Sequence, residues 1–435
     1  MKVMAVAVVS AILAGSPALA APTGDQSFEF EIARAKGTLH NPWTGSSDPV
    51  ELRSFVGSGA AEGDFVAPTI RIAPGRTLTI DLDNKLEPCT QEQIAKHRCF
   101  NETNLHTHGL WVSPSGNSDN VLISIPPGEK FRYEYEISND HPAGTFWYHP
   151  HRHGAGYVQV GSGMAGALIV TGDRKPTADR PGDIDILLKD ENGRAFPERV
   201  MLFQQIQYGC LDEKGEIEGT KKKEKFPSGG EAEVYVRPWT CAAGRVGRVE
   251  SDDNDWDWQW SGRFTGINGK VQPRLETARA GRFERWRMIH AGTREPVRVQ
   301  LRALAANAPD LHEVKGADQE KWIADHCTGE PLPMWQVAMD GLARSNVRQV
   351  TSAVLFSGDR MDVIARFPAA GRYCMIHDAR RLSNRPLPVR ALTVIEAIGS
   401  APGSAELDGE AMLTASLVQA AQLSLSGAGE VRDRV

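Results

Sequence analysis

Hydrophobic and polar residues alternate with a period of two along most of the chain. Residues 68–72 read PTIRI and residues 77–82 read TLTIDL, with a Pro-Gly turn between the two runs. Residues 131–137 read FRYEYEI after another Pro-Gly turn, and runs of this kind recur to about residue 400. Such alternation is typical of strands that bury one face, whereas patterns of helical period are scarce. The chain is therefore predicted to be all-β and built from β-sandwiches.

The order of these runs repeats once, which predicts two structural units. A strand led by proline, a Gly-Arg turn and a second strand occur near residue 70, and the same order returns over residues 273–289. Residues 126–151 likewise match residues 358–378 in order and character. A repeat of this kind indicates that both units have the same architecture.

The repeat divides the chain into segments. Residues 21–176 and 190–400 are predicted to form the two domains, with a boundary in the stretch of Gly, Asp, Pro and Lys near Gly172–Pro181. Two domains of ordinary size suit a length of 435 residues. Residues 401–435 are too few for another sandwich, so we expect a linker there.

The first residues carry the pattern of a secretory signal. Lys2 is followed by an apolar run and then by Ala18-Leu19-Ala20, a small-residue cleavage pattern. Gly15 and Pro17 break the short apolar run, which argues against a membrane anchor. No later segment is apolar enough to span a bilayer. We predict that residues 1–20 are a signal peptide and that the mature protein is periplasmic or secreted, with no membrane partner.

The charge of the chain argues against one class of partner. The formal net charge is −6 at pH 7, so nothing indicates binding to nucleic acid or to an anionic membrane. The basic run KKKEK at residues 221–225 has neither interleaved aromatic residues nor a helical stripe. We interpret this run as a solvated loop.

The chain has six cysteines, and an even number in an oxidising compartment favours disulfides. Six cysteines allow fifteen pairings, so the connectivity is not fixed by their number. Closeness in sequence favours Cys89–Cys99, Cys210–Cys241 and Cys327–Cys374.

Five of the twelve histidines lie in two short motifs, HTHG at residues 106–109 and HPHRHG at residues 149–154. Because residues i and i+2 of a strand project to the same face, each motif presents at least two imidazoles together. Neutral imidazole is a common ligand of Cu, Zn, Fe and Ni. A single pair would more simply be hydrogen-bonded, but two pairs predict a metal site. The glycine that ends each motif permits close approach of backbone or ligand.

The residues around these motifs resemble a known family. NLHTHGLWVSPSGNSDNV at residues 104–121 and AGTFWYHPHRHG at residues 143–154 resemble the first cupredoxin domain of the multicopper oxidases, which include laccases and ascorbate oxidase. GSGMAGALIV at residues 161–170 is similar to the closing strand of that domain. FTGINGKVQP at residues 264–273 is similar to part of the family's middle domain. The resemblance implies tandem cupredoxin-like Greek-key β-sandwiches.

Matched residue by residue, the family's motifs imply copper ligands. His106 corresponds to a ligand of the type 2 copper, and His108, His149 and His151 correspond to ligands of the type 3 pair. Together they would supply half of the histidines of a trinuclear copper cluster. Asp119 stands where the family often has an acid near the water channel, so it is a candidate proton relay. The alternative for Asp119 is a turn residue.

The motif of a type 1 copper does not occur in the chain. Such a centre needs a Cys thiolate, two His and a weak axial ligand. Alignment of the two repeats places Ile376 and Asp378 opposite His149 and His151, so the second domain lacks the ligand positions. We expect a copper-free middle domain. The resemblance implies that a third cupredoxin domain, downstream or on another chain, supplies the type 1 site and the remaining ligands.

The resemblance implies a multicopper oxidase, cut short, that couples one-electron oxidation of a small-molecule reductant to reduction of O2 to water. Without an electron-entry site, this chain alone is expected to be inactive. One alternative is a copper-binding or scaffold cupredoxin protein without turnover. Another is a zinc hydrolase, since HTHG also occurs on barrel strands, but the alternating strands and helices of that fold are lacking.

Overall fold

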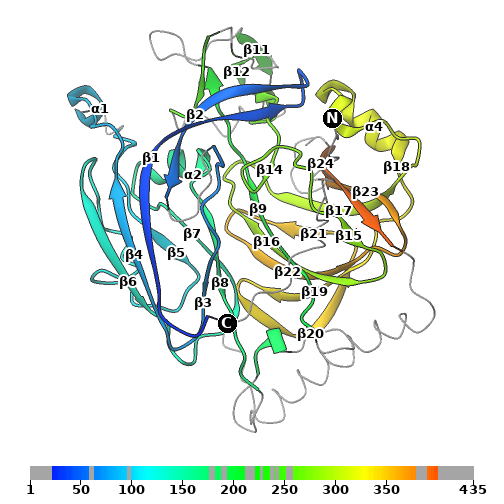
Figure 1. The fold of residues 1–435 in the computed structure, drawn as a ribbon. Helices are drawn as coiled ribbons and strands as arrows, with labels where there is room; N and C mark the ends of the chain where they lie inside the picture. The colour runs from blue at the N-terminus through cyan, green and yellow to red at the C-terminus, as the bar shows by residue number, and fades with distance from the viewer. Residues whose placement is uncertain are drawn as a thin grey trace, which may run out of the picture.

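The computed structural model describes most of the chain and confirms the all-β fold. Strands predominate, and they form two β-sandwiches that lie side by side (Figure 1). Two predicted segments, the signal at residues 1–20 and the linker at residues 401–435, lie outside the described residues. The description covers residues 22–57, 63–95, 99–175, 182–186, 188, 194–210, 221–225, 229–235, 241, 244–250, 258–378 and 389–399.

The first sandwich pairs a six-stranded sheet with a four-stranded sheet, and the predicted alternation buries the faces between them. Leu78 and Ile80 of one sheet and Phe146 and Tyr148 of the other are fully buried. In spatial order the larger sheet contains β10 (Gly209–Cys210), β13 (Gly247–Arg248), β2 (Ser46–Val56), β1 (Gln26–Asn41), β4 (Thr77–Asn84) and β6 (Lys130–Glu136). The smaller contains β3 (Ile70–Ile72), β8 (Gly166–Val170), β7 (Gly144–His149) and β5 (His106–His108).

The second sandwich has the same two-layer architecture and a separate core. One sheet contains β14 (Gly266–Ile267), β9 (Glu198–Gln204), β16 (Phe283–His290), β22 (Arg360–Arg366), β19 (Met334–Met339) and β20 (Leu342–Val350). The other contains β15 (Ala278–Arg279), β24 (Val389–Ile398), β23 (Gly371–Asp378), β17 (Val297–Leu304) and β18 (Cys327–Thr328), with β21 (Ala353–Leu355) paired to β17.

The helices of the described residues are short, and none has the length and apolar character needed to cross a membrane. The α-helices are α1 (Gln91–Ala95), α2 (Gly156–Gly161), α3 (Trp258–Ser261) and α4 (Gln319–His326). Single 3-10 turns occur at Ile184–Ile186, Leu311–Glu313 and Gly316–Asp318.

Two short strands from beyond residue 200 complete the sheet of the first sandwich. β13 pairs in parallel with β2, where Gly247 lies opposite Val50, and β10 pairs with β13. Arg53 of β2 donates a hydrogen bond to the Val249 carbonyl at 2.7 Å and pairs with Glu250 at 2.8 Å. The strand order at this edge therefore does not follow the order of the sequence.

The basic run at residues 221–225 is a strand, so its interpretation as a loop is wrong. β11 (Lys221–Lys225) pairs with β12 (Glu231–Tyr235) in a separate two-stranded hairpin at the top of Figure 1. Lys225 lies opposite Glu231, and their charged groups are 3.3 Å apart. Opposite charges on facing positions support the pairing of two strands that have few apolar residues.

Three disulfides join the six cysteines as closeness in sequence predicted. The pairs are Cys89–Cys99, Cys210–Cys241 and Cys327–Cys374. Because these pairs account for all six cysteines, no thiol of the chain is free to ligate a metal.

The outer face of the four-stranded sheet packs against the second sandwich. This contact gives the first domain's β7 and β8 a buried environment on both faces. The apolar residues that meet here are Trp147, Ala165, Ala167 and Ile169 of the first sandwich and Leu202, Ile289 and Ala291 of the second.

A network of charged residues is buried at the same interface. Arg285 and Arg287 of β16 contact the carboxylates of Asp362, Asp185 and Glu198. Arg287 and Asp362 are each 1% exposed, so the network is shielded from solvent. Buried charges are tolerated only where they are paired and hydrogen-bonded, as they are here.

This network predicts a loss of stability in acid. Burial raises the pKa of Glu198, but Arg287 and Arg285 outweigh burial and hold that pKa below its ordinary value. A carboxyl group with a depressed folded-state pKa stabilises the fold above its unfolded pKa, about 4, and loses this contribution as pH falls through the folded pKa. We expect the free energy of unfolding to decrease below about pH 4, and to decrease less steeply in Glu198→Gln. Urea unfolding across that range measures both slopes, and equal slopes would contradict the expectation.

Candidate metal centre

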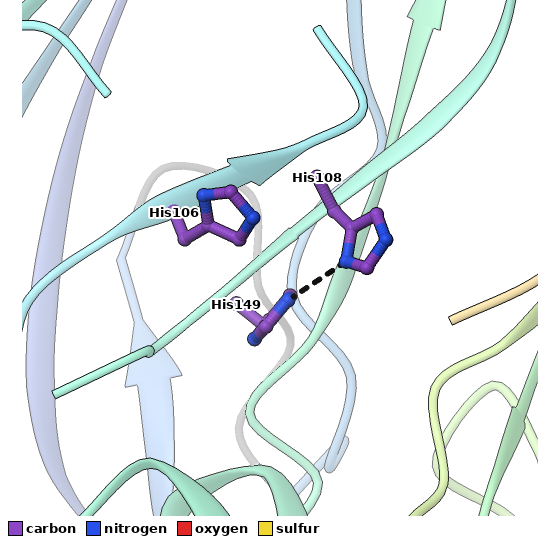
Figure 2. A group of neighbouring side chains, drawn as sticks. All are labelled: His106, His108 and His149. Carbon is purple, nitrogen blue, oxygen red and sulfur yellow. Dashed lines mark hydrogen bonds between the residues drawn. The ribbon is translucent and has the colours of Figure 1, made fainter. Parts of the chain in front are cut away.

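Three histidines from two adjacent strands meet at one end of the four-stranded sheet. His106 and His108 lie on β5, and His149 is the last residue of β7. The two strands pair antiparallel with His106 opposite His149. One ring nitrogen of each histidine lies within 4.8 Å of the others, and the three rings point into a common space (Figure 2).

The histidines project from the face of the sheet that is directed at the second sandwich. Phe146 and Tyr148 of β7 belong to the core of the first sandwich, whereas Trp147 belongs to the cluster between the sandwiches. His149 shares the face of Trp147, because side chains two residues apart in a strand point the same way. The prediction that imidazoles share one face of the sheet therefore holds for His106 and His108 of the first motif and for His149, the first histidine of the second.

His151 does not continue the strand, so the expectation that it shares a strand face with His149 is wrong. β7 ends at His149, because Pro150 has no N–H to donate to a neighbouring strand. The N–H of His151 instead donates a hydrogen bond to Asn104 Oδ1 at 2.7 Å. The ring of His151 is exposed, and its centroid lies 5.1 Å from that of His106. It is adjacent to the three converging histidines but outside their 4.8 Å cluster.

Hydrogen bonds fix which ring nitrogen of two histidines carries the proton. His106 Nδ1 lies 3.0 Å from both carboxylate oxygens of Asp119, and a carboxylate can only accept. His149 Nδ1 lies 2.9 Å from the carbonyl oxygen of Pro150, which also can only accept. In their neutral forms both rings therefore carry the proton on Nδ1 and have their lone pair on Nε2. The Nε2 atom of His149 lies 3.4 Å from His108 Nδ1 and accepts a hydrogen bond from it (Figure 2), so a metal would have to replace this contact.

Burial keeps two of the imidazoles neutral. The pKa of His108 is lowered to about 4, mainly by burial and then by the positive charge of Arg360. The pKa of His149 is held well below its ordinary value, mainly by burial and then by His106. A metal binds the unprotonated imidazole, so both rings are in the form that ligates near neutral pH.

The two motif glycines have different roles. Gly109 has φ of 86°, and a β-carbon there would collide with the guanidinium group of Arg360 from the second sandwich. A close neighbour is therefore present at Gly109, but it is a side chain and not the backbone or ligand that was predicted. Gly154 has φ of 83°, but nothing lies within 4 Å of a β-carbon placed on it. Its role is to allow the turn into α2 and not to admit a neighbour.

A cavity of about 810 Å³ lies in front of the histidines. The first sandwich contributes the histidines, His153 and Tyr157, and the second contributes two loops at Gly292–Thr293 and Ser357–Gly358. The candidate centre therefore lies in a hollow between the sandwiches. Among the described residues, the histidines that could bind a metal all line the side formed by the first sandwich.

Several residues of the site were not found by sequence reasoning. Asn104 holds the backbone of His151, and the indole of Trp147 stacks on the ring of His149 with centroids 4.0 Å apart. Both lie next to a histidine motif, so proximity in sequence was an available signal. Arg360 and the two loops of the second sandwich had no local signal.

Within the part of the chain that the structure describes, the second sandwich does not repeat the site. Cys374 is in a disulfide, so it offers no thiolate. His377 is 1% exposed, and its Nδ1 accepts a hydrogen bond from the N–H of Arg298 at 3.0 Å.

Solved structures with a similar fold are multicopper oxidases. A laccase-like multicopper oxidase from Ochrobactrum sp. has a TM-score of 0.53 at 16% identity, covering 88% of this chain and 65% of that one. A laccase from Pediococcus acidilactici has a TM-score of 0.52 at 14% identity, covering 89% and 61%. At this identity the likeness concerns the fold, which is that of tandem cupredoxin-like domains.

Sequence comparison relates one segment of the chain to the same family. Residues 57–175 match the multicopper oxidase family profile. L-ascorbate oxidase of Cucurbita maxima is 32% identical over 137 residues, which are 29% of this chain and 20% of that protein. A laccase of Trametes maxima is 26% identical over 113 residues, which are 25% and 21% of the two chains. The segment that carries the histidines is similar to the multicopper oxidases, as the resemblance predicted, and the matches span about a fifth of these curated relatives.

Proposed function

We propose that this chain is part of a multicopper oxidase and that His106, His108, His149 and His151 are copper ligands. The observation that carries the proposal is the convergence of three imidazoles whose ligand atoms lie within 4.8 Å of one another. The match of residues 57–175 to the family supports copper as the metal. Copper held by these residues would supply the redox chemistry, in which electrons from a small-molecule reductant, together with protons, convert O2 to water.

The donor set fits copper. Imidazole nitrogen is a preferred ligand of copper. His106 and His149 hold the proton on Nδ1 and turn Nε2 toward the cluster, and burial keeps His108 neutral. In the proposed assignment His106 binds the type 2 copper, and His108, His149 and His151 bind the type 3 pair. The chain's own contribution is to line one cavity with these rings and, by burial, to keep His108 and His149 unprotonated.

Asp119 is proposed to orient His106 and to serve as a proton relay beside the ligands. Its Oδ1 atom accepts hydrogen bonds from the N–H of Thr107 at 2.7 Å and from the Thr107 hydroxyl at 3.0 Å, in addition to its contact with His106. These contacts hold the carboxylate against the β5 strand. The same carboxylate is a titratable group one hydrogen bond away from a ligand, where a relay would need one.

Asp119→Asn is expected to weaken copper binding by about 10–100-fold, the usual contribution of a partner that orients a metal-bound histidine. Thr107 donates two hydrogen bonds to Oδ1, so asparagine would keep its carbonyl oxygen there and place its NH2 group beside Nδ1 of His106. An NH2 group only donates, so it would favour the His106 tautomer with the proton on Nε2, the nitrogen that should bind copper. Competition with a chelator measures the dissociation constant. Asp140→Asn, on an exposed turn of the same sandwich, is the control and is expected to bind as the wild type does. Unchanged binding in Asp119→Asn would contradict the orienting role.

The type 1 centre is proposed to lie outside this chain. Such a centre requires a thiolate, and all six cysteines are in disulfides. We propose that a further cupredoxin domain supplies that centre and the remaining ligands on the open side of the cavity. Alone, the chain would bind copper without turning over a reductant.

Export to the periplasm or the cell exterior is also proposed. Three disulfides suit an oxidising compartment, and the pattern of the first residues is that of a secretory signal. The reducing cytosol would not favour three such bonds.

Copper loading of the purified full chain tests the proposal. After incubation with Cu2+ and dialysis, we expect retained copper with the electron paramagnetic resonance spectrum of nitrogen-ligated Cu2+ and without intense blue absorption. The absence of the blue band follows from the lack of a free thiolate. A chain that retains no copper after dialysis would overturn the proposed function.

A further inference from the structure

We propose that Thr145 is a positioning residue, through which a buried ion network of the second sandwich sets the place of strand β7 and therefore of His149. The inference rests on the proposed copper site. It assigns a task to the second sandwich, which offers no thiolate and no repeat of the histidine cluster among its described residues.

Thr145 and His149 project from the same face of β7. They are separated by Trp147, and side chains at every second position of a strand share a face. All three are buried, with exposed fractions of 1% for Thr145, 4% for Trp147 and 8% for His149. One short strand thus carries an anchor at its start and a metal ligand at its end.

The hydroxyl group of Thr145 bridges two charged residues of the second sandwich. It donates a hydrogen bond to Asp362 Oδ1 at 2.6 Å and accepts one from Arg287 Nη1 at 3.1 Å. Both capacities of the hydroxyl are used. Hydrogen bonds to charged partners are the stronger kind, and buried ones are costly to leave unmade.

The partners of Thr145 are themselves fixed. Asp362 Oδ2 accepts hydrogen bonds from Arg285 Nε at 3.0 Å and from Arg285 Nη2 at 2.7 Å. Arg287 Nη2 donates to Glu198 at 2.6 Å. The anchor point on the second sandwich is therefore held by several charge-assisted contacts on strands β9, β16 and β22, and does not depend on Thr145 for its own position.

Two further contacts hold β7 against the same surface. At Gly144 a β-carbon would collide with the carbonyl oxygen of Gly341, so the backbones of the two sandwiches touch there. Trp147 packs in the apolar cluster with Leu202 and Ile289, and its ring stacks on His149 at an angle of 22°. A shift of β7 at Thr145 would therefore move the indole that supports the ligand ring.

The ligand geometry is sensitive to such a shift. Metal ligands must be held within about 0.5 Å of the productive arrangement, and the groups that hold them do so by packing and hydrogen bonds. β5 pairs with β7 through His106–His108. A shift of Trp147, on which the His149 ring stacks, would therefore change the place of that ring relative to His106 and His108.

A role in positioning differs from a role in stability alone, and Thr393 provides the comparison. Thr393 of β24 is as buried as Thr145, at 1% exposed, and its hydroxyl donates a hydrogen bond to the Pro273 carbonyl at 2.5 Å. It lies in the other sheet of the second sandwich and does not line the cavity. Loss of either hydroxyl should destabilise the fold, but only loss of the Thr145 hydroxyl should disturb copper.

The experiment compares full-length Thr145→Val, Thr145→Ser and Thr393→Val with the wild type. Copper affinity is measured by chelator competition, the electron paramagnetic resonance spectrum of bound Cu2+ is recorded, and urea unfolding gives stability. We expect Thr145→Val to lose about tenfold in affinity, at the low end for groups that orient metal ligands, and to show altered copper hyperfine splitting. Thr145→Ser should restore both, and Thr393→Val should lose stability alone.

The outcomes separate this inference from the proposed function. If the wild type retains copper and Thr145→Val binds it with the same affinity and spectrum, the positioning role is overturned while the copper site stands. If the wild type retains no copper, the proposed function is overturned and the inference with it. Should Thr145→Val fail to fold, Thr145→Ala, which leaves room for water beside Asp362, is measured against the same expectations.

Discussion

Replacement of both His106 and His149 by alanine is expected to abolish copper retention by the full chain. The two residues lie opposite each other on β5 and β7 and belong to the cluster whose ligand atoms are within 4.8 Å. Groups that merely orient a ligand contribute about 10–100-fold to affinity, so loss of two direct ligands should cost more than about 100-fold. Metal analysis after dialysis, together with chelator competition, measures the change.

The control for this double variant replaces two histidines outside the cluster, as His153→Ala with His326→Ala. His153 lines the same cavity but is exposed, and His326 lies on α4 of the second sandwich. This control should retain copper as the wild type does. If the double variant of His106 and His149 also retained copper, binding would have to be assigned elsewhere and the copper site of the proposed function would be lost.

The parts of the fold that could be predicted are those whose signals are local. Alternation along β4 and β6 predicted their buried faces, and Leu78, Ile80 and Tyr133 are fully buried. The disulfides joined cysteines that are close in sequence, from 10 residues apart for Cys89–Cys99 to 47 for Cys327–Cys374. Each of these features depends on neighbours along the chain.

The predictions of strands were wrong or incomplete where the pairing of one strand with another decides the structure and the local sequence pattern does not. The basic run at residues 221–225 lacks apolar alternation, yet it forms a strand in which Lys223 and Lys225 face Glu233 and Glu231 of β12. β10 and β13 are two residues long, which is too short for any periodicity to be read. Their addition to the sheet of the first sandwich depends on contacts with β2 that no local pattern encodes.

The candidate site was predictable to the same extent. The two histidine motifs carried a local signal, and the register of β5 against β7 brought three of the imidazoles together. The departure of His151 follows from Pro150, whose missing N–H ends the strand. The opposite wall of the cavity, at Gly292–Thr293 and Ser357–Gly358, comes from residues more than a hundred positions away, so only the packing of two domains could place it.

Asp362→Ala is expected to lower the free energy of unfolding by about 3–5 kcal/mol, the usual effect of removing one partner of a buried ion pair. Asp362 accepts hydrogen bonds from Arg285 at 2.7 Å and from Thr145 at 2.6 Å, and it is 1% exposed. Alanine leaves Arg285 without its strongest contact with β22, in a site that water does not reach. Urea unfolding of the variant and the wild type gives the difference.

Asp81→Ala is the matched control, because Asp81 forms an ion pair of similar length on the surface. Its carboxylate lies 2.8 Å from Arg132, but the two side chains are 41% and 60% exposed. Solvent screens such a pair, so its loss should cost less than about 1 kcal/mol. Equal losses in the two variants would mean that burial does not set the contribution of the Asp362 contacts, and the interface between the sandwiches would then owe its stability to the apolar cluster around Trp147.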